Sequence, residues 1–193
     1  LTFIAPVNSI IYNNAKPIFM DCDNFYNLDV NKTIQFIKTE TVFKRNFTFN
    51  KKTGNRIPVI LPVHLWGNAV ELECLMKLCK QRNIAIVEDA AESFGTKYIR
   101  GKLKNKFTGT VGKFGCLSFN GNKIITTGGG GMLLTDDKKL AKKAKYLTTQ
   151  AKDDSIYSIH NEVGYNFRLT NILAALGLAQ LESLSKYIKK KKI

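Results

Sequence analysis

A lysine and an aspartate stand out because each follows an apolar stretch typical of a buried strand. Asp89 closes the run "IAIVED", and Lys123 lies in the loop after "KFGCLS", the run that ends at Ser118. In open parallel sheets, ligands bind outside the carboxyl ends of the strands. Pyridoxal phosphate needs both residue types, a lysine for its Schiff base and an acid beside its ring nitrogen. The two residues therefore predict a site for this cofactor.

Each of these features also has a plain structural interpretation. Asp89 could be a helix N-cap at the turn formed by the following "AAES", and Lys123 could be a solvated lysine in a flexible loop. The glycine run 128–131 could form a simple turn, and it matches neither the GxGxxG pattern nor a Walker loop. Ser118 is a further candidate because its hydroxyl, at a strand end just before the lysine loop, could bind a phosphate.

The chain has 193 residues and a net charge of +15, from 30 Lys and Arg against 15 Asp and Glu. Its hydrophobic fraction of 44% and charged fraction of 23% are typical of a soluble globular protein. Nucleic-acid binding is the first hypothesis for such a charge. The basic residues are spread along the chain, however, without an RNP motif, zinc spacing or a helix-turn-helix. We interpret the charge as a solvated surface that also suits an anionic small molecule.

The cysteines and histidines predict neither disulfides nor a metal site. No CxxC pair occurs, and two of the four cysteines fall inside predicted apolar elements, which favours buried reduced thiols. Only two histidines are present. No apolar run reaches membrane-spanning length and the start shows no signal peptide, so a cytoplasmic protein without a membrane partner is expected. The residues concerned are Cys22, Cys74, Cys79, Cys116, His64 and His160.

Hydrophobic periodicity predicts an α/β protein. Residues 57–64 and 84–89 are apolar and β-rich, and residues 68–83 between them carry apolar side chains at helical spacing. This strand–helix–strand unit predicts a parallel sheet with helices packed against it. Further strands are expected at 18–21, 113–119 and 131–136, further helices at 27–38, 137–149 and about 169–190, and a polar surface excursion at 44–56. No internal boundary is evident, so one domain is expected.

Three long stretches resemble a known enzyme family. They are "VHLWGNAVELECLMKLCKQRNIAIVEDAAESFGTKY", "GKFGCLSFNGNKIITTGGGGMLLTDD" and "EVGYNFRLTNILAALGLAQLESL", and the N-terminal "LTFIAPVNSIIYNNAKPIFMDCD" matches too. Together they closely resemble the PLP-dependent sugar-nucleotide aminotransferases of the DegT and StrS type. Details such as "LTFIAPVN" and "SFNGNK" are most similar to the branch that makes 4-amino-4,6-dideoxy sugar nucleotides for bacterial surface glycans. The resemblance implies the three-layer α/β/α large domain of a fold-type I PLP-dependent transferase, with a mostly parallel mixed sheet.

The resemblance also implies roles for individual residues. Lys123 would hold pyridoxal 5'-phosphate as a Schiff base and then move the proton between the substrate carbon and the cofactor. Asp89 would pair with the pyridine nitrogen. Ser118 would bind the phosphate, and Phe3 would stack on the cofactor ring.

The stretch "GYNFR" extends this expectation to a second subunit. Asn166 would reach the phosphate of the partner subunit, with Arg168 near it, which implies a homodimer with shared active sites. Taken alone, the same stretch would be a turn that leads into a capped helix.

The sequence departs from the family's pattern at several places. Glu92 stands where the family often has Gln or His near the ring hydroxyl of the cofactor, and the run 128–131 lacks the family's glutamate. The loop 97–113 is longer and more basic than usual. The family's N-terminal phosphate-binding segment and C-terminal small domain lie outside residues 1–193, so we expect a partial PLP-binding large domain.

The function expected from these observations is transfer of an amino group, from glutamate, to a 4-keto-6-deoxy sugar nucleotide by ping-pong chemistry. A PLP-dependent sugar-nucleotide dehydratase is an alternative within the family, but those enzymes replace the Schiff-base lysine with histidine, and Lys123 argues against it. A non-catalytic, basic, nucleic-acid-binding α/β domain is the alternative outside the family, and it would leave Asp89 and Lys123 unexplained.

Overall fold

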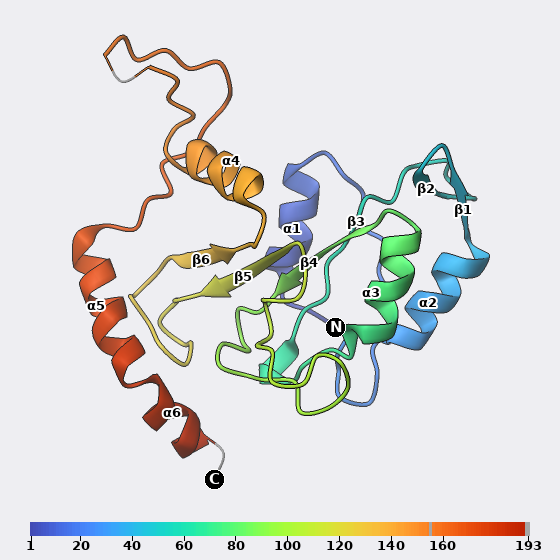
Figure 1. The fold of residues 1–193 in the computed structure, drawn as a ribbon, viewed down its shortest axis with the longest axis horizontal. Coiled ribbons are helices and arrows are strands. Elements are labelled where there is room, and N and C mark those ends of the chain that lie inside the picture. The colour runs from blue at the N-terminus through green and yellow to red at the C-terminus, as the bar shows by residue number, and fades with distance from the viewer. Residues whose placement is uncertain (155, 192–193) are drawn as a thin grey trace. The chain divides into compact units, whose positions relative to one another are not determined.

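The computed structural model describes residues 1–154 and 156–191, and Figure 1 shows it as a ribbon. The chain divides into two compact units, Leu1–Leu117 and Ser118–Ile193. That both belong to one large domain stays a prediction. Among the described residues, no helix combines the length and the apolar character that crossing a membrane requires.

Three parallel strands form the sheet of the first unit. β3 (Val59–Ile60), β4 (Ala85–Asp89) and β5 (Phe114–Ser118) lie side by side in that order (Figure 1). The helix α3 (Leu72–Gln81) connects β3 to β4. The predicted strand–helix–strand unit is therefore confirmed, although the apolar stretch 57–64 forms a regular strand over only two of its residues.

The hydrophobic core of this unit lies where α3 meets α2 (Val30–Thr39) and the strands. Leu72 and Leu75 on α3 have no exposed surface, and Ile37 on α2 is only 1% exposed. Residues three and four positions apart lie on one face of a helix, so the apolar spacing noted in the sequence buries a single stripe. Each such side chain contributes about 1.5–3 kcal/mol of transfer free energy on burial.

The polar segment expected to be a surface excursion contains a β-hairpin. β1 (Thr41–Lys44) and β2 (Phe47–Asn50) pair antiparallel across a two-residue turn. Both turn residues, Arg45 and Asn46, have positive φ angles of 50° and 63°, as the tight turns that match strand twist require. Thr48 anchors the hairpin, because its buried hydroxyl donates a hydrogen bond to the carbonyl of Arg82 at 2.6 Å.

The N-terminal region differs from expectation in two ways. Residues Ile4–Tyr12 form a helix, α1, that periodicity did not indicate. Residues 18–21 belong to no strand, so that prediction is wrong. Apolar side chains alone do not make a strand, since a strand also needs a backbone partner. Ile18 and Phe19 are instead 46% and 71% exposed.

The second unit contains the remaining regular elements. A strand, β6 (Gly131–Leu134), precedes α4 (Lys138–Thr148), and two further helices follow, α5 (Asn171–Glu182) and α6 (Leu184–Lys191). The single helix predicted at about 169–190 is thus divided at Ser183, the residue between them.

Side chains of neighbouring residues cap the two longer helices of this unit. The carboxylate of Asp137 accepts hydrogen bonds from the amides of Lys139 and Leu140 at the start of α4. The hydroxyl of Thr170 accepts from Leu173 at the start of α5. Such caps satisfy backbone donors that have no partner within the helix.

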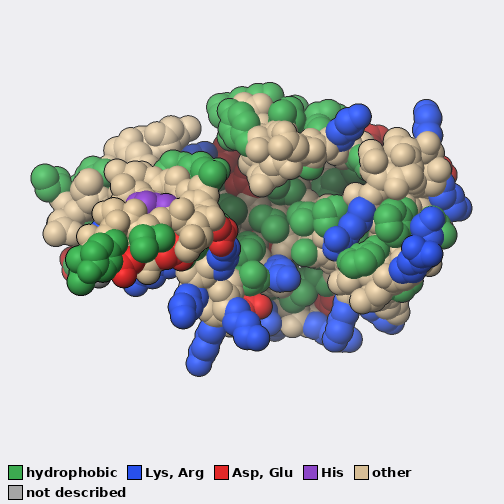
Figure 2. Space-filling model, turned by 90° about the horizontal axis from the view of Figure 1, so that it is seen from above, with side chains coloured by type: hydrophobic (Ala, Val, Ile, Leu, Met, Phe, Trp, Pro, Cys, Tyr) green, Lys and Arg blue, Asp and Glu red, His purple; other side chains and the backbone are tan. Residues whose placement is uncertain are grey.

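Basic side chains are distributed over the surface. On the face drawn in Figure 2, Lys and Arg side chains lie in several places, some adjoining one another and others separated by hydrophobic and neutral groups. The five lysines of α4 lie within a single helix that has no buried residue. The distribution agrees with the interpretation of the charge as a solvated surface.

Candidate active site

Asp89 is the last residue of β4, and backbone hydrogen bonds hold it from both sides. Its amide donates to the carbonyl of Pro62 at 2.9 Å, and its own carbonyl accepts from the amide of His64 at 3.0 Å. On the other side, Asp89 pairs with Cys116 of β5, whose carbonyl accepts from the amide of Ala90 at 2.9 Å. The strand end therefore presents the carboxylate from a fixed backbone.

The Asp89 carboxylate also caps the turn that follows. Its Oδ1 accepts a hydrogen bond from the amide of Ala91 at 3.0 Å. The sequence allowed Asp89 to cap a helix, but a turn follows it instead, and the carboxylate caps that turn. This role does not exclude a second one, because an ionised carboxylate offers about four acceptor positions.

Glu92 holds the segment that follows β3. Its Oε2 accepts a hydrogen bond from the amide of Trp66 at 2.8 Å. Trp66 has a φ angle of 52°, a left-handed conformation uncommon for a bulky residue, and its side chain is 64% exposed. The hydroxyl of Thr96 donates to the next residue, at the carbonyl of Gly67, at 2.9 Å. Glu92 and Thr96 therefore stabilise a strained turn next to the strand end.

Phe3 stands immediately before the first helix and is 74% exposed. An aromatic ring so placed can stack on a ligand, although nothing within the first unit covers most of its surface. Its assignment to the cofactor stays a prediction.

Lys123 lies in a loop whose two ends are closed by the backbone of Phe119. The amide of Phe119 donates to the carbonyl of Gly130, and its carbonyl accepts from the amide of Thr127, both at 3.0 Å. Within the loop, the amide of Lys123 donates to the carbonyl of Asn120 at 3.0 Å. Lys123 is half-buried. The backbone hydrogen bonds of Phe119 therefore close the loop, with Lys123 near its middle. The glycines alone would have indicated a flexible segment.

Two of the four consecutive glycines have a conformational reason to be there. Gly128 and Gly130 have φ angles of 82° and 87°, which residues with a β-carbon rarely adopt. A β-carbon on Gly130 would also lie 3.0 Å from Cδ1 of Leu169. Around Gly128 and Gly129, by contrast, a β-carbon would meet no atom within 4 Å, so these glycines face open space within the second unit.

Ser118 is the last residue of β5 and is half-buried. Its Oγ accepts a hydrogen bond from the amide of Asn120 at 3.3 Å, a contact that does not use the hydroxyl proton. Ser118 comes two residues after Cys116, the register partner of Asp89, so both polar residues stand at carboxyl ends of neighbouring parallel strands.

Asn166 and Arg168 lie on an extended segment that runs along the end of α4. Asn166 forms a bridge with Thr149, and the amide of Phe167 donates to the carbonyl of Thr148 at 3.0 Å. Both candidate residues are exposed. Their expected role in the site of a partner subunit stays a prediction.

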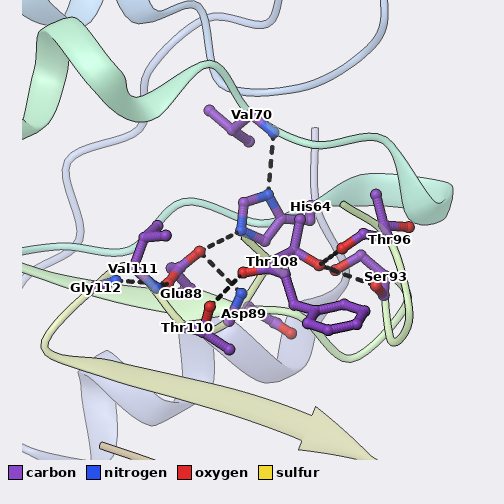
Figure 3. Close-up of polar contacts among 12 residues, drawn as sticks. His64, Val70, Glu88, Asp89, Ser93, Thr96, Thr108, Thr110, Val111 and Gly112 are labelled. Atoms are coloured by element: carbon purple, nitrogen blue, oxygen red, sulfur yellow. Dashed lines mark hydrogen bonds and ion pairs between the residues drawn. The ribbon is translucent and has the colours of Figure 1, made fainter. Parts of the chain in front are cut away.

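The most completely buried polar pair is one that sequence reasoning did not select. Glu88 and His64 have no exposed surface, and Oε2 of Glu88 lies 2.9 Å from Nε2 of His64 (Figure 3). The available signal was the acid inside the apolar run "IAIVED", since a buried carboxylate must have a partner. What the sequence did not show was which residues would supply it.

The comparisons with known proteins give the family. A profile of the DegT/DnrJ/EryC1/StrS aminotransferase family matches residues 1–193. The chain belongs to this family. GDP-perosamine synthase of Escherichia coli O157:H7 is 40% identical over 192 residues, which cover 100% of this chain and 47% of that protein. The chain thus spans about half the length of such relatives.

Solved structures agree with the family assignment. Helicobacter pylori PseC, an aminotransferase involved in the biosynthesis of pseudoaminic acid, matches with a TM-score of 0.79 at 29% identity, over 95% of this chain and 44% of that one. The PLP form of Spr1654 from Streptococcus pneumoniae matches with a TM-score of 0.75 at 25% identity, over 96% and 47%. The prediction of a fold-type I α/β architecture is therefore confirmed.

Proposed function

We propose that residues 1–193 form part of the PLP-binding large domain of an aminotransferase that acts on a sugar nucleotide. The observation that carries the proposal is the placement of Asp89 and Ser118 at the carboxyl ends of adjacent parallel strands, with Lys123 in the closed loop that follows. Ligands of open parallel sheets bind at this edge. Family membership and the names of the relatives support the same conclusion.

The residues present fit pyridoxal phosphate. The cofactor requires an amine for covalent attachment, an acid for its ring nitrogen and donors for its phosphate, and Lys123, Asp89 and Ser118 are of these types. Open space beside Gly128 and Gly129 leaves room near the lysine loop. When bound, pyridoxal phosphate supplies a ring that withdraws electrons from the substrate carbon.

Each side chain then has a defined task. The Asp89 carboxylate would accept a hydrogen bond from the protonated ring nitrogen and would stabilise the positive charge there. The Lys123 amine would hold the cofactor covalently and would serve as the base and acid that moves a proton at the substrate carbon. The Ser118 hydroxyl would donate to a phosphate oxygen, and Phe3 would stack on the ring. Glu92, with Oε2 bound to the Trp66 amide, contributes by fixing the turn beside the site.

The substrate we propose is a 4-keto-6-deoxy sugar nucleotide, with glutamate as the amino donor, in the synthesis of a surface glycan. A protein with a net charge of +15 attracts an anionic diphosphate substrate. Asn166 and Arg168 are proposed to serve the phosphate in the site of a second copy, so that a homodimer with shared sites results. The proposed location is the cytoplasm, with neither nucleic acid nor a membrane as a partner.

The decisive experiment compares Lys123→Ala with Lys139→Ala in the full-length protein. Lys139 is an exposed lysine on α4, so its replacement controls for the loss of one positive charge. We expect the wild type and the Lys139 variant to show a visible cofactor absorption band that borohydride bleaches, and the Lys123 variant to lack it while keeping its circular dichroism spectrum. A wild type that never takes up pyridoxal phosphate would disprove the proposal.

A second experiment addresses the substrate. Incubation of the wild type with glutamate and a panel of keto-sugar nucleotides should give an aminated sugar nucleotide, detected by mass spectrometry. Release of 2-oxoglutarate without an aminated sugar would contradict the proposed acceptor while leaving the cofactor assignment in place.

A further inference from the structure

The Glu88 carboxylate is surrounded by four hydrogen-bond donors. Its Oε2 accepts from the side chain of His64 and from the amide of Gly109, both at 2.9 Å. Its Oε1 accepts from the amides of Val111 at 2.8 Å and Gly112 at 2.6 Å. Figure 3 shows the carboxylate between the His64 ring and the 109–112 segment. Each oxygen thus has two donors, which is the full acceptor capacity of an ionised carboxylate.

The hydrogen bonds of His64 fix where its proton lies. The amide of Val70 donates to Nδ1 at 3.0 Å, so Nδ1 must be the unprotonated nitrogen. The ring proton therefore lies on Nε2, where it is donated to Glu88. The ring is neutral in this arrangement, and Glu88 is stabilised by oriented N–H groups and not by a full positive charge.

This network joins three segments that are far apart in the sequence, and they meet next to the carboxyl end of β4. His64 follows β3, Glu88 belongs to β4, and residues 109–112 precede β5. His64 and Glu88 are also direct backbone neighbours of Asp89, since the His64 amide donates to the Asp89 carbonyl and Glu88 precedes it in β4. Successive side chains of a strand point to opposite faces, so Glu88 anchors one face while Asp89 presents its carboxylate on the other.

We propose that Glu88 and His64 are positioning residues that fix the Asp89 carboxylate for the cofactor's ring nitrogen. We call the hydrogen-bonded network of Glu88, His64 and the 109–112 amides the clamp. The role of Asp89 rests on the function proposed above, whereas the clamp rests on the contacts just described. Glu88 does not touch the ligand in this scheme, because all of its acceptor positions are occupied and the side chain has no exposed surface. Because hydrogen bonds hold the Asp89 backbone from both sides, and Glu88 and His64 fix that strand end, the carboxylate is kept within the narrow geometry that catalysis needs.

The charge state of Glu88 agrees with this role. Burial alone would raise the pKa of Glu88, but the hydrogen bonds from His64, Gly112 and Gly109 outweigh it and bring the pKa below its usual value. Two further titratable groups that interact with Glu88 are the Tyr98 hydroxyl and the Cys116 thiol, whose pKa values are both raised, first by burial and then by nearby carboxylates. Both are neutral at pH 7, so neither supplies a counter-charge.

Two variants of His64 test its role as hydrogen-bond donor to Glu88. His64→Gln places an amide N–H at about the reach of Nε2 and keeps a donor to the carboxylate, whereas His64→Leu has a similar size and no donor. In the full-length enzyme, we expect kcat to fall about tenfold in His64→Leu and less in His64→Gln, with the KM for the sugar nucleotide nearly unchanged in both. If His64 were needed only for folding, both variants would give less folded enzyme. The kcat per bound cofactor would then be the same in His64→Leu and His64→Gln.

A cofactor-free measurement keeps the test separate from the proposed function. The amide of Ala91 is bonded to Oδ1 of Asp89, so its hydrogen exchange in the apoprotein reports whether that carboxylate stays in place. We expect exchange at Ala91 to accelerate about tenfold in His64→Leu, with amides of α2 unchanged. Glu71→Gln is the control, because Glu71 is an exposed acid in an ion pair with Arg100 and lies outside the network.

The outcomes separate the two proposals. If the wild type binds no pyridoxal phosphate, the proposed function fails, and the exchange data alone decide whether Asp89 is clamped. Equal kcat values in the Gln and Leu variants, or unchanged exchange at Ala91, would overturn the positioning role even in a fully active enzyme. Should both variants fail to fold, nitrogen NMR of the wild type decides, since a ring proton on Nδ1 of His64 at neutral pH is incompatible with the clamp.

Discussion

Gly115 of β5 lies directly against the backbone of Gly109. A β-carbon on Gly115 would be 1.8 Å from the Gly109 carbonyl oxygen and 2.7 Å from its α-carbon. Real β-carbons do not approach backbone atoms so closely, so the position admits only glycine without a shift of one chain segment. The contact brings the 109–112 segment close enough to β4 for its amides to reach Glu88.

Gly115→Ala is therefore expected to destabilise the protein strongly. The substitution overpacks a backbone–backbone contact, and overpacking costs about 1–3 kcal/mol or more of unfolding free energy. Urea unfolding followed by circular dichroism measures the change. Gly121→Ala is the matched control, because a β-carbon there would meet no atom within 4 Å. Equal unfolding midpoints for the two variants would contradict the close contact.

Ser118→Ala should weaken cofactor binding while leaving the fold intact. A hydrogen bond to a charged group contributes about 1.5–3 kcal/mol, so the loss of one phosphate donor predicts a dissociation constant at least about tenfold higher. Titration of the full-length apoprotein with pyridoxal phosphate, followed by absorbance, checks this. Ser9→Ala is a suitable control, since the Ser9 hydroxyl bonds only locally, to the carbonyl of Pro6 in α1. An unaltered affinity in Ser118→Ala would remove Ser118 from the phosphate site.

The buried carboxylate predicts a specific loss of stability in acid. Because the folded state lowers the pKa of Glu88 below 4.5, its contribution is fully present above pH 4.5 and disappears as the pH falls through the folded-state pKa. Glu88→Gln turns one acceptor into a donor that faces two N–H groups, which should cost about 1–3 kcal/mol near neutral pH. The difference in unfolding free energy between wild type and variant should therefore shrink below pH 4.5.

Urea unfolding at a series of pH values measures this difference. Asp21 and Asp153 also have lowered pKa values, first because of the hydrogen bonds from Lys32 and from the Asn161 amide, but they titrate in both proteins and cancel. Glu71→Gln provides the baseline for an exposed acid. A constant difference across the whole pH series would show that folding does not lower the pKa of Glu88.

The thiols should react in an order set by their exposure. Cys74 is exposed, whereas Cys79 is 1% exposed and burial raises the pKa of its thiol to about 12. Since the thiolate is the reactive form, a maleimide should label Cys74 first and Cys79 only after unfolding. Mass spectrometry of digested protein identifies the labelled residue, and Cys74→Ser should abolish the fastest phase. Rapid labelling of Cys79 in the folded protein would contradict the described core.

Elements that are apolar and locally periodic could be predicted from the sequence. The stripe of α3 and the apolar run of β4 each indicate their structure within a short window, and the parallel connection between them follows from general rules. The hairpin β1–β2 was missed because its buried residues are polar (Thr41, Thr48 and Asn50), and because its Arg45–Asn46 turn lacks the usual glycine. Its stability depends on Thr48 reaching Arg82, a distant contact.

The candidate site was predictable to a different degree for different residues. Strand-end placement indicated Asp89 and Ser118 directly, because an acid or a hydroxyl after an apolar run is a local signal. The partners of Glu88 could not be predicted, since His64 lies 24 residues before it and the nearest amide donor, from Gly109, lies 21 residues after it. An acid inside an apolar strand indicates that its carboxylate is buried and has hydrogen-bond partners. Which residues are these partners becomes known only from the folded structure.

Four N–H groups converging on Glu88 also limit which sequences this fold accepts. Glutamine at position 88 would place N–H donors where acceptors are needed, and serine or threonine would accept too few hydrogen bonds. Aspartate is one methylene shorter, so its carboxylate would not reach the same donors. Position 88 therefore has almost no freedom to vary. In directed evolution toward other sugar nucleotides, Glu88 and His64 are therefore best left unchanged while other positions are varied.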